Sequence, residues 1–272
     1  MSALRAVSVW IVAFALAVAL AALFATLTVY QLTSEDTGER ILRRSIAATT
    51  DIDAALPRIE ADLDRLTTGD SPETATVPNF PIQAELTREE ATTLRGGELR
   101  DVILDRAAHK LYTVGGDAWT EGDPQANRNI ERVSTTGAID YGLGFVRDST
   151  NAVFLVLAVI LAVVAIGMTA VLLVVLPWDM RLLGAGSVAV VAGLPGLAAA
   201  VAVRFVFRTA DDEGDPFVKA MLDLGVDSMW VPIRNFAVLS LFGFLLIIIA
   251  TTLLWWGARH RPAGSPALDT QS

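Results

Sequence analysis

The stretch that decides the fold is Ala152–Leu176, AVFLVLAVILAVVAIGMTAVLLVVL, which the short connection Pro177–Arg181 joins to a second apolar stretch, Leu182–Phe207. Both are longer than the roughly 20 apolar residues that a helix needs to cross a bilayer. Ala6–Tyr30 and Phe236–Trp256 have the same character. The sequence therefore predicts an all-α integral membrane protein with four transmembrane helices, in which the second and third form an antiparallel hairpin.

Polar sequence between these stretches defines the predicted organisation of the chain. A long polar block separates the first apolar stretch from the second, whereas only short segments separate the others. A tail with proline and glycine follows the last stretch and is predicted to be disordered. The predicted parts are transmembrane helix 1 in residues 1–32, an acidic, mainly helical extracytoplasmic domain in 33–150, transmembrane helices 2–4 in 151–258 with a short acidic loop at 208–228, and the tail in 259–272.

The first apolar stretch also has a feature of secretory signal peptides. Ala19-Leu20-Ala21 matches the A-x-A pattern of a cleavage site. The apolar run nevertheless continues to Tyr30, well past the length of a typical signal-peptide core. We therefore expect an uncleaved membrane anchor.

Acidic residues are concentrated in the polar block. The chain has 30 Asp and Glu against 21 Lys and Arg, and residues 33–150 alone hold 22 acids and 13 bases, which accounts for the whole net charge of −9. A surface of this sign repels phosphate backbones, so no nucleic-acid partner is expected. The chain also has no cysteine, which excludes disulfides, thiolate metal sites and thiol catalysis.

The orientation is predicted from basic residues at the ends of the chain. Positive charges flank the apolar stretches almost equally on the two sides, so the usual cytoplasmic excess of Lys and Arg decides little. Arg5 before the first stretch and Arg259-His260-Arg261 after Trp255-Trp256 are both typical of cytoplasmic flanks. We therefore expect a multi-pass protein of the cell membrane with both termini in the cytoplasm.

Apolar residues in the acidic block recur at helical spacing. Intervals of four and three place five of them on one helix face, namely Ile52, Leu56, Ile59, Leu63 and Leu66. Pro57 is expected to begin a new helix here, because the first helical residue has no intrahelical amide bond to lose. The row is interpreted as an amphipathic helix on a small core. A coiled-coil seam and a kinked continuation of the first transmembrane helix remain as alternatives.

Capping residues and glycines place the remaining elements of the block. Thr87-Arg88-Glu89-Glu90 is a capping box, in which the Thr87 and Glu90 side chains each bond the other residue's backbone amide. Glycine pairs then end two successive helices. The resulting assignment is a loop over Thr67–Asn79, an extended segment over Phe80–Leu86, helices from Thr87 to Gly96 and from Glu98 to Val114, a loop over Asp117–Asn129, and a short strand or interfacial segment within Ile130–Val146.

Small residues form rows on two of the apolar stretches. Such rows let helix backbones approach closely in lipid. The rows are Ala158, Ala162, Ala165 and Thr169 on the second stretch, and Ala185, Ala189, Gly193, Gly196 and Ala200 on the third. We expect the two rows to face each other, although an alanine-rich composition by itself also produces such rows.

Known motifs of catalysis and ligand binding are absent from the sequence. There is no HExxH, no Gly-x-Ser-x-Gly, no phosphate-binding glycine loop and no Cys/His zinc spacing. His109 is expected to face solvent. The sequence therefore predicts no catalytic, cofactor-binding or metal-ligating residue, no cofactor and no enzyme activity.

The acidic cluster Asp211–Asp215 has two interpretations. Several carboxylates around a turn suit a hard cation such as calcium, but the spacing does not match an EF-hand loop. The favoured interpretation is a solvated loop in which Asp215 caps a short helix. Pro216 would be its first residue, Phe217–Leu224 its body and Gly225 its end.

Features expected of a transporter are weak. No apolar stretch carries an ionisable residue near its centre, where ion-coupled transporters place such groups. Gly193-Leu194-Pro195-Gly196 lies in the middle of the third stretch, and broken helices line the binding sites of transporters. A packing kink is the favoured interpretation of this proline.

Composition and one segment carry a resemblance to a known group of proteins. Lysine occurs only at Lys110 and Lys219, and 19 of the 30 acids are aspartate. With the segment from Leu86-Thr87-Arg88-Glu89-Glu90 through Leu99-Arg100-Asp101 to Leu111-Tyr112, the chain resembles uncharacterised multi-spanning membrane proteins of haloarchaea. The resemblance implies a salt-adapted membrane protein and no particular activity. A GC-rich bacterial genome would also favour Arg and Ala over Lys.

Two functions fit these observations. The favoured one is a non-enzymatic integral membrane protein whose acidic extracytoplasmic domain contacts an envelope or membrane partner. The alternative is a small transporter or channel subunit. A uniformly apolar bundle would favour the first, and polar residues gathered on one helix face would favour the second. The expected partners are the lipid bilayer and another membrane or envelope protein, with homo-oligomers left open.

Overall fold

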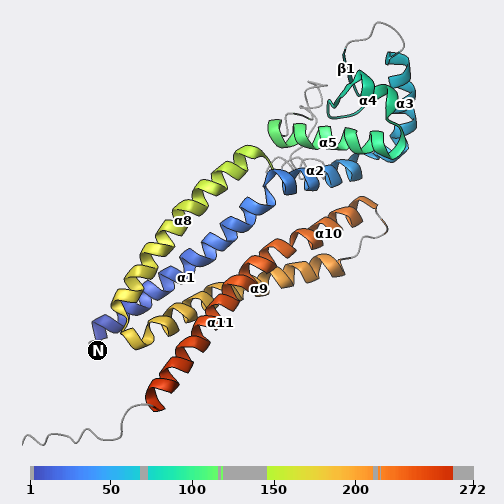
Figure 1. Cartoon of the computed structure of the whole chain (residues 1–272). Coiled ribbons are helices and arrows are strands. Elements are labelled where there is room, and N and C mark those ends of the chain that lie inside the picture. Colours follow the sequence, from blue (N-terminus) through green and yellow to red (C-terminus); the bar gives the residue numbers. More distant parts are fainter. Residues whose placement is uncertain are drawn as a thin grey trace, which may run out of the picture. The chain divides into compact units, whose positions relative to one another are not determined.

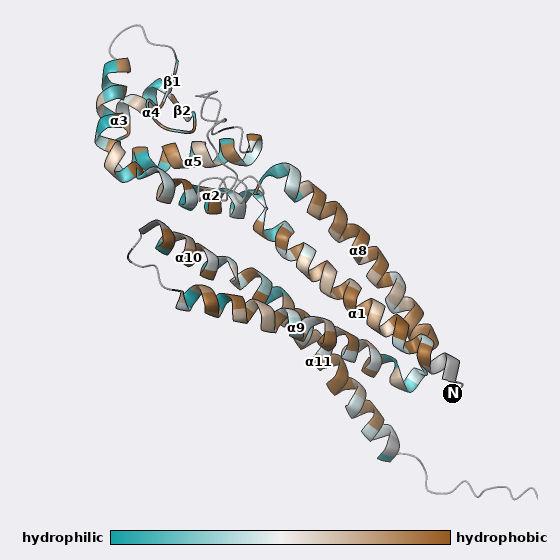
Figure 2. Ribbon diagram, turned by 180° about the vertical axis from the view of Figure 1, so that it is seen from behind, coloured by the Kyte–Doolittle hydropathy of each residue, from teal (hydrophilic) through white to brown (hydrophobic). Residues whose placement is uncertain are grey.

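The part of the chain that the structure describes is almost entirely helical and includes four long helices (Figure 1). The computed structural model describes residues 3–67, 73–115, 118, 146–210, 214 and 216–259. The long helices are α1 (Ala3–Leu32), α8 (Asp148–Val175), α9 (Arg181–Thr209) and α11 (Trp230–Arg259). All four are long and apolar enough to cross a membrane, as predicted, and Figure 2 colours most of their residues as hydrophobic.

The chain divides into two compact units. The first, which we call the bundle, comprises residues 1–25, 158–200 and 232–272, and the second, which we call the helical domain, comprises residues 26–157 and 201–231. Each of the helices α1, α8 and α9 has one end in the bundle and the other end in the helical domain. The helical domain therefore includes more of the chain than the acidic block alone.

In the bundle, four alanines, three leucines and one valine form a buried cluster, whereas many other large apolar side chains are exposed. The buried set is Leu16, Ala17, Ala165, Leu172, Val188, Ala189, Ala192 and Leu239. Trp10 and Val174, in contrast, are 77% and 76% exposed. This distribution is the one expected of helices that pack through small residues and present apolar side chains to lipid.

Gly193 and Gly196 of α9 pack against α11, and not against α8 as predicted. A Cβ added to Gly193 would collide with the Ser240 hydroxyl, and one added to Gly196 would lie 2.5 Å from the Phe236 ring. Gly186 makes the same kind of contact about two turns from Gly193, where an added Cβ would lie 2.8 Å from the Gly243 carbonyl oxygen. The prediction failed because the short loop makes α8 and α9 sequential neighbours but does not decide which partner receives the glycine face.

Helix α9 is continuous through the predicted kink site. Pro195 lies inside the helix, and both Leu194 and Pro195 are exposed on its surface. The proline removes one amide donor, but the helix runs without a break from Arg181 to Thr209.

The helical domain is built from short elements around α2 and α5. In chain order they are α2 (Glu35–Thr50), α3 (Ile52–Thr67), β1 (Thr74–Thr76), β2 (Glu85–Thr87), α4 (Arg88–Thr93), α5 (Gly96–Val114) and α10 (Pro216–Ser228). The two strands form one antiparallel pair, with Ala75 opposite Leu86. The left-handed residue Asp51, with φ 44°, turns the chain between α2 and α3.

A hydrophobic core holds these elements together. Its large, fully buried members include Leu42, Ile46, Ile52, Leu63, Ile82, Leu86, Leu99, Ile103, Leu104 and Leu111. In the predicted apolar row, Ile52, Ile59 and Leu63 are buried, whereas Leu66 is half exposed. The row is therefore the buried face of an amphipathic helix. The alternative of a continued first helix is wrong, because α1 ends at Leu32.

Several boundaries differ from the prediction. Pro57 lies inside α3 and does not begin it, because Asp51 already turns the chain there. Thr74–Thr76 is a strand within the predicted loop, since it pairs with Glu85–Thr87. Helix α4 ends at Thr93 instead of Gly96, and α5 begins at Gly96.

Helix α10 also extends beyond its predicted end. It begins at Pro216 as predicted but continues to Ser228. Gly225 does not close it, because this glycine packs on Phe207, whose ring would lie 3.0 Å from an added Cβ. The predicted loop over Asp117–Asn129 and the segment Ile130–Val146 lie almost wholly outside the described residues.

Ion pairs connect the helices on the surface of the domain. Arg43 of α2 pairs with Asp101 and Asp105 of α5, both at 2.8 Å. Further pairs join Asp53 to Arg100 at 2.6 Å, Asp64 to Arg95 at 2.6 Å, Glu90 to Arg106 at 3.1 Å, and Arg44 to Asp227 of α10 at 2.8 Å. The Asp and Arg enrichment of the sequence therefore serves contacts between helices in this unit.

Candidate functional site

Among the described residues, side chains that could bind a metal ion gather near the turn between α1 and α2. Helix α1 ends at Leu32 and α2 begins at Glu35, so the chain turns at Thr33 and Ser34. The Tyr112 hydroxyl of α5 donates to the Thr33 carbonyl oxygen at 3.0 Å. The Asn151 amide of α8 donates to the Tyr30 carbonyl oxygen at 2.8 Å. Two other helices thus satisfy carbonyl groups at the end of α1.

Three metal-ligating side chains converge beside this turn. Glu35 and Glu39 are four residues apart on α2 and therefore share one face of the helix. His109 reaches them from α5, with its Nδ1 2.6 Å from Glu39 Oε1. One ligand atom from each of the three residues lies within 4.8 Å of the other two. We call Glu35, Glu39 and His109 the carboxylate–histidine cluster.

Close packing of α2 on α5 fixes the position of this cluster. Gly38, which lies between the two glutamates, faces Tyr112, and an added Cβ would be 3.0 Å from the ring. Leu42 of α2 and Ala108 of α5 are fully or almost fully buried one turn further along. The glutamates and the histidine therefore emerge from two backbones that cannot slide freely past each other.

The electrostatic environment of the cluster is negative. Burial raises the pKa of the Tyr112 hydroxyl first, and the charges of Asp148, Glu35 and Glu39 raise it further. The Tyr112 side chain stays neutral and acts as a hydrogen-bond donor at any physiological pH. The negative charges of these three carboxylates thus oppose ionisation of the buried Tyr112 hydroxyl at the edge of the cluster.

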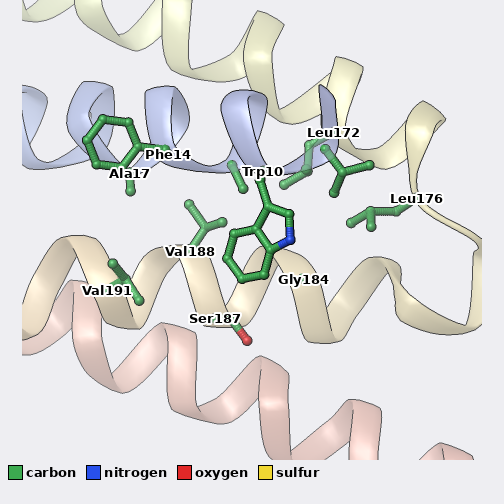
Figure 3. Close-up of a pocket in the computed structure, with 11 residues that line it drawn as sticks. Trp10, Phe14, Ala17, Leu172, Leu176, Gly184, Ser187, Val188 and Val191 are labelled. Atoms are coloured by element: carbon green, nitrogen blue, oxygen red, sulfur yellow. The ribbon is translucent and has the colours of Figure 1, made fainter. Parts of the chain in front are cut away.

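The bundle contains a groove of a different kind. It has a volume of about 390 Å³ and is lined by α1, α8 and α9. In Figure 3 the Trp10 ring extends from α1 toward α9 and lies beside Gly184. Ser187 is the polar side chain among the lining residues, and its hydroxyl already donates to the Leu183 carbonyl oxygen. The groove is lined almost wholly by apolar side chains and therefore suits an apolar occupant.

A recess in the helical domain lies between α2 and α10. It has a volume of about 580 Å³ and is lined by alanines and charged groups, including Ala47, Ala48, Asp223 and the Arg44–Asp227 pair.

The sequence did not identify the carboxylate–histidine cluster. His109 is exposed as expected, but it has the Glu39 partner that the sequence could not reveal across 70 residues. The available signal was the spacing of Glu35 and Glu39, which is common on helix surfaces. The predicted acidic cluster Asp211–Asp215 lies outside the described residues except for Gly214.

Comparison with family models, with curated proteins and with solved structures found no match to this chain.

Proposed function

We propose that the chain is a multi-pass protein of the cell membrane whose acidic helical domain contacts another membrane or envelope protein. Four spans place both termini on one side of the membrane and the acidic block on the other. The basic residues at the chain ends assign the termini to the cytoplasm and the acidic block to the outside.

The observation that carries this proposal is the apolar interior of the bundle. Among its described residues, the buried polar side chains are Asn235 and Ser240, and no charged side chain is buried. Ser240 donates to the Phe236 carbonyl oxygen of its own helix. Ionisable groups at mid-membrane depth mark the routes of ions and solutes, so the absence of charged side chains from the described part of this interior favours anchoring over transport.

The helical domain has the properties of a contact module. Its own hydrophobic core holds it together, so its surface is free to carry charge. The acidic excess of residues 33–150 favours a partner with a basic surface, because complementary potentials speed encounter and exclude wrong partners.

The proposed topology is tested with single cysteines, since the chain has none of its own. Ala54 is exposed on α3, and Ser265 is in the C-terminal tail. In intact cells an impermeant maleimide should label Ala54→Cys and not Ser265→Cys. Labelling of the tail cysteine alone would reverse the orientation.

The proposed contact is tested with a photo-crosslinking amino acid in native membranes. Placed at Ala54 of the domain, it should yield one recurring protein adduct, which acidic-to-neutral substitutions on the domain should weaken. Placed at Val163, which is 65% exposed in the bundle, it should yield lipid adducts only. The transporter hypothesis would be supported instead by two results together. The domain position would form no protein adduct, and the purified chain would carry ions or solutes across liposome membranes.

A further inference from the structure

We propose that the carboxylate–histidine cluster binds a divalent first-row transition-metal ion, with Zn²⁺ as the ion that fits best. This site goes beyond the proposed partner contact and does not depend on it. Its ligands would be one carboxylate oxygen each from Glu35 and Glu39 and one ring nitrogen of His109.

The donor atoms already converge. They lie within 4.8 Å of one another, so small side-chain rotations bring each to a metal–ligand distance of roughly 2.0–2.2 Å. Glu39 and His109 are in direct contact, with Nδ1 and Oε1 2.6 Å apart. A bound ion would replace the hydrogen bond between these two groups, and the other ring nitrogen of the neutral imidazole would carry its proton.

The scaffold holds the donors before any ion arrives. Glu35 and Glu39 are in the first two turns of α2, and His109 is in α5, which packs on α2 through Gly38 and Tyr112. The Tyr112 hydroxyl ties α5 to the Thr33 carbonyl just ahead of Glu35. Ligands from two helices that are already packed together lose little conformational freedom on binding, which favours affinity.

The ligand set selects the kind of ion. Magnesium and calcium prefer oxygen ligands and gain little from an imidazole, whereas zinc accepts both nitrogen and carboxylate oxygen. The side chains of Glu39 and His109 are 31% and 58% exposed, so water can supply a fourth ligand. The negative charges of Glu35, Glu39 and Asp148, which act together on Tyr112, also attract a cation to this place.

Binding is tested on the full-length chain in detergent after chelator treatment. Equilibrium dialysis against ZnCl₂ should give one zinc per chain, and excess Mg²⁺ or Ca²⁺ should not displace it. Glu35→Gln and His109→Gln should each weaken binding by at least about tenfold, since even loss of an outer partner of a metal ligand costs that much. The control is His260→Gln, which removes the other histidine of the chain and should bind zinc like the unmodified protein.

A second measurement needs no variant. Zinc should protect His109 of the unmodified chain from diethyl pyrocarbonate, while His260 stays reactive, as mass spectrometry would show. If the unmodified chain takes up no zinc, or if His109 reacts equally with and without it, the proposal is overturned. Unchanged zinc affinity in the His109→Gln variant would overturn it as well.

Discussion

The helical domain and the bundle differ in which side chains they bury and which they expose. The domain buries large residues such as Ile103 and Leu111 completely and connects its helices by Arg–carboxylate pairs. The bundle buries glycines and alanines and leaves large residues such as Ile160 and Phe242 exposed. Both units are built mainly from helices, so secondary structure does not explain the difference. We attribute it to the surroundings of each unit, which in the proposed topology are water for the domain and lipid for the bundle.

The physical cause is the driving force available in each environment. In water, burial of apolar area stabilises a fold by roughly 25 cal/mol per Å², so the largest side chains go inside. In lipid that gain disappears, and helices associate by close contact of small residues. The five predictions below test this contrast, beginning with the largest expected effect.

The first prediction compares two isoleucines. Ile103→Ala removes a fully buried side chain and should cost about 2–5 kcal/mol of domain stability. Ile160→Ala, at a position 54% exposed on the bundle, should cost little because lipid replaces the lost methylenes. Hydrogen exchange of the α5 amides measures the loss of stability in Ile103→Ala. Thermal unfolding in detergent measures the loss in Ile160→Ala. Similar losses at both positions would show that the bundle surface is not solvated by lipid.

The second prediction concerns the glycine contact between α9 and α11. Gly193→Leu would force its side chain into the Ser240 hydroxyl and backbone, and should cost about 1–3 kcal/mol. Thermal unfolding in detergent measures the loss.

Val191→Leu provides the matched control for this glycine. Val191 is 63% exposed on the same helix, so the added methylene should be nearly neutral. Equal effects of the two substitutions would mean that the glycines do not specify the α9–α11 contact.

The third prediction concerns the capping box of α4. The Glu90 amide donates to the Thr87 hydroxyl at 3.2 Å, and the Thr87 amide donates to Glu90 Oε2 at 2.8 Å. Thr87→Ala should cost the domain about 1 kcal/mol, whereas Thr87→Ser, which keeps the hydroxyl, should be nearly neutral. Denaturant unfolding followed by hydrogen exchange of α4 and α5 measures both. A serine variant as unstable as the alanine variant would assign the loss to the threonine methyl group.

The same box predicts a pH dependence. The hydrogen bond from the Thr87 amide lowers the pKa of Glu90, with a smaller contribution from Arg106. A carboxyl whose pKa is lowered by folding stabilises the fold above its ordinary pKa, and this stability is lost as the pH falls below that value through the lowered one. The loss of stability caused by Glu90→Gln should therefore shrink in that acidic range and stay constant at neutral pH, as denaturant unfolding at several pH values would show.

The smallest effect is expected from the surface ion pairs. Arg43→Gln removes two contacts whose partners, Asp101 and Asp105, are more than half exposed. Such pairs contribute about 0.2–1 kcal/mol, and salt screens them. The loss should be measurable by denaturant unfolding at low salt and should disappear at molar salt. A loss that grows with salt would indicate a packing role of the arginine stem.

Much of this architecture follows from sequence alone, for a local reason. A run of more than 20 apolar residues such as Ala152–Leu176 has few alternatives to a long helix. The capping box at Thr87, the helix end at Gly115 and the start of α10 at Pro216 were also predictable, because each depends on neighbours within four residues. Acid and base counts place the acidic excess in residues 33–150, and its role as an extracytoplasmic domain stays a prediction.

Only the tertiary structure decided the features that join distant residues. Gly193 required close approach of some helix, but the choice of α11 over α8 depends on how whole helix faces fit. The strand at Thr74–Thr76 exists because Glu85–Thr87 lies beside it, and Pro57 stays inside α3 because Asp51 turns the chain earlier. Glu39 and His109 are 70 residues apart, and only the packing of α2 on α5 brings their side chains into contact. A sequence pattern indicates the conformational preference of neighbouring residues. Contacts between distant residues depend instead on the free energy of packing all the helices and strands together.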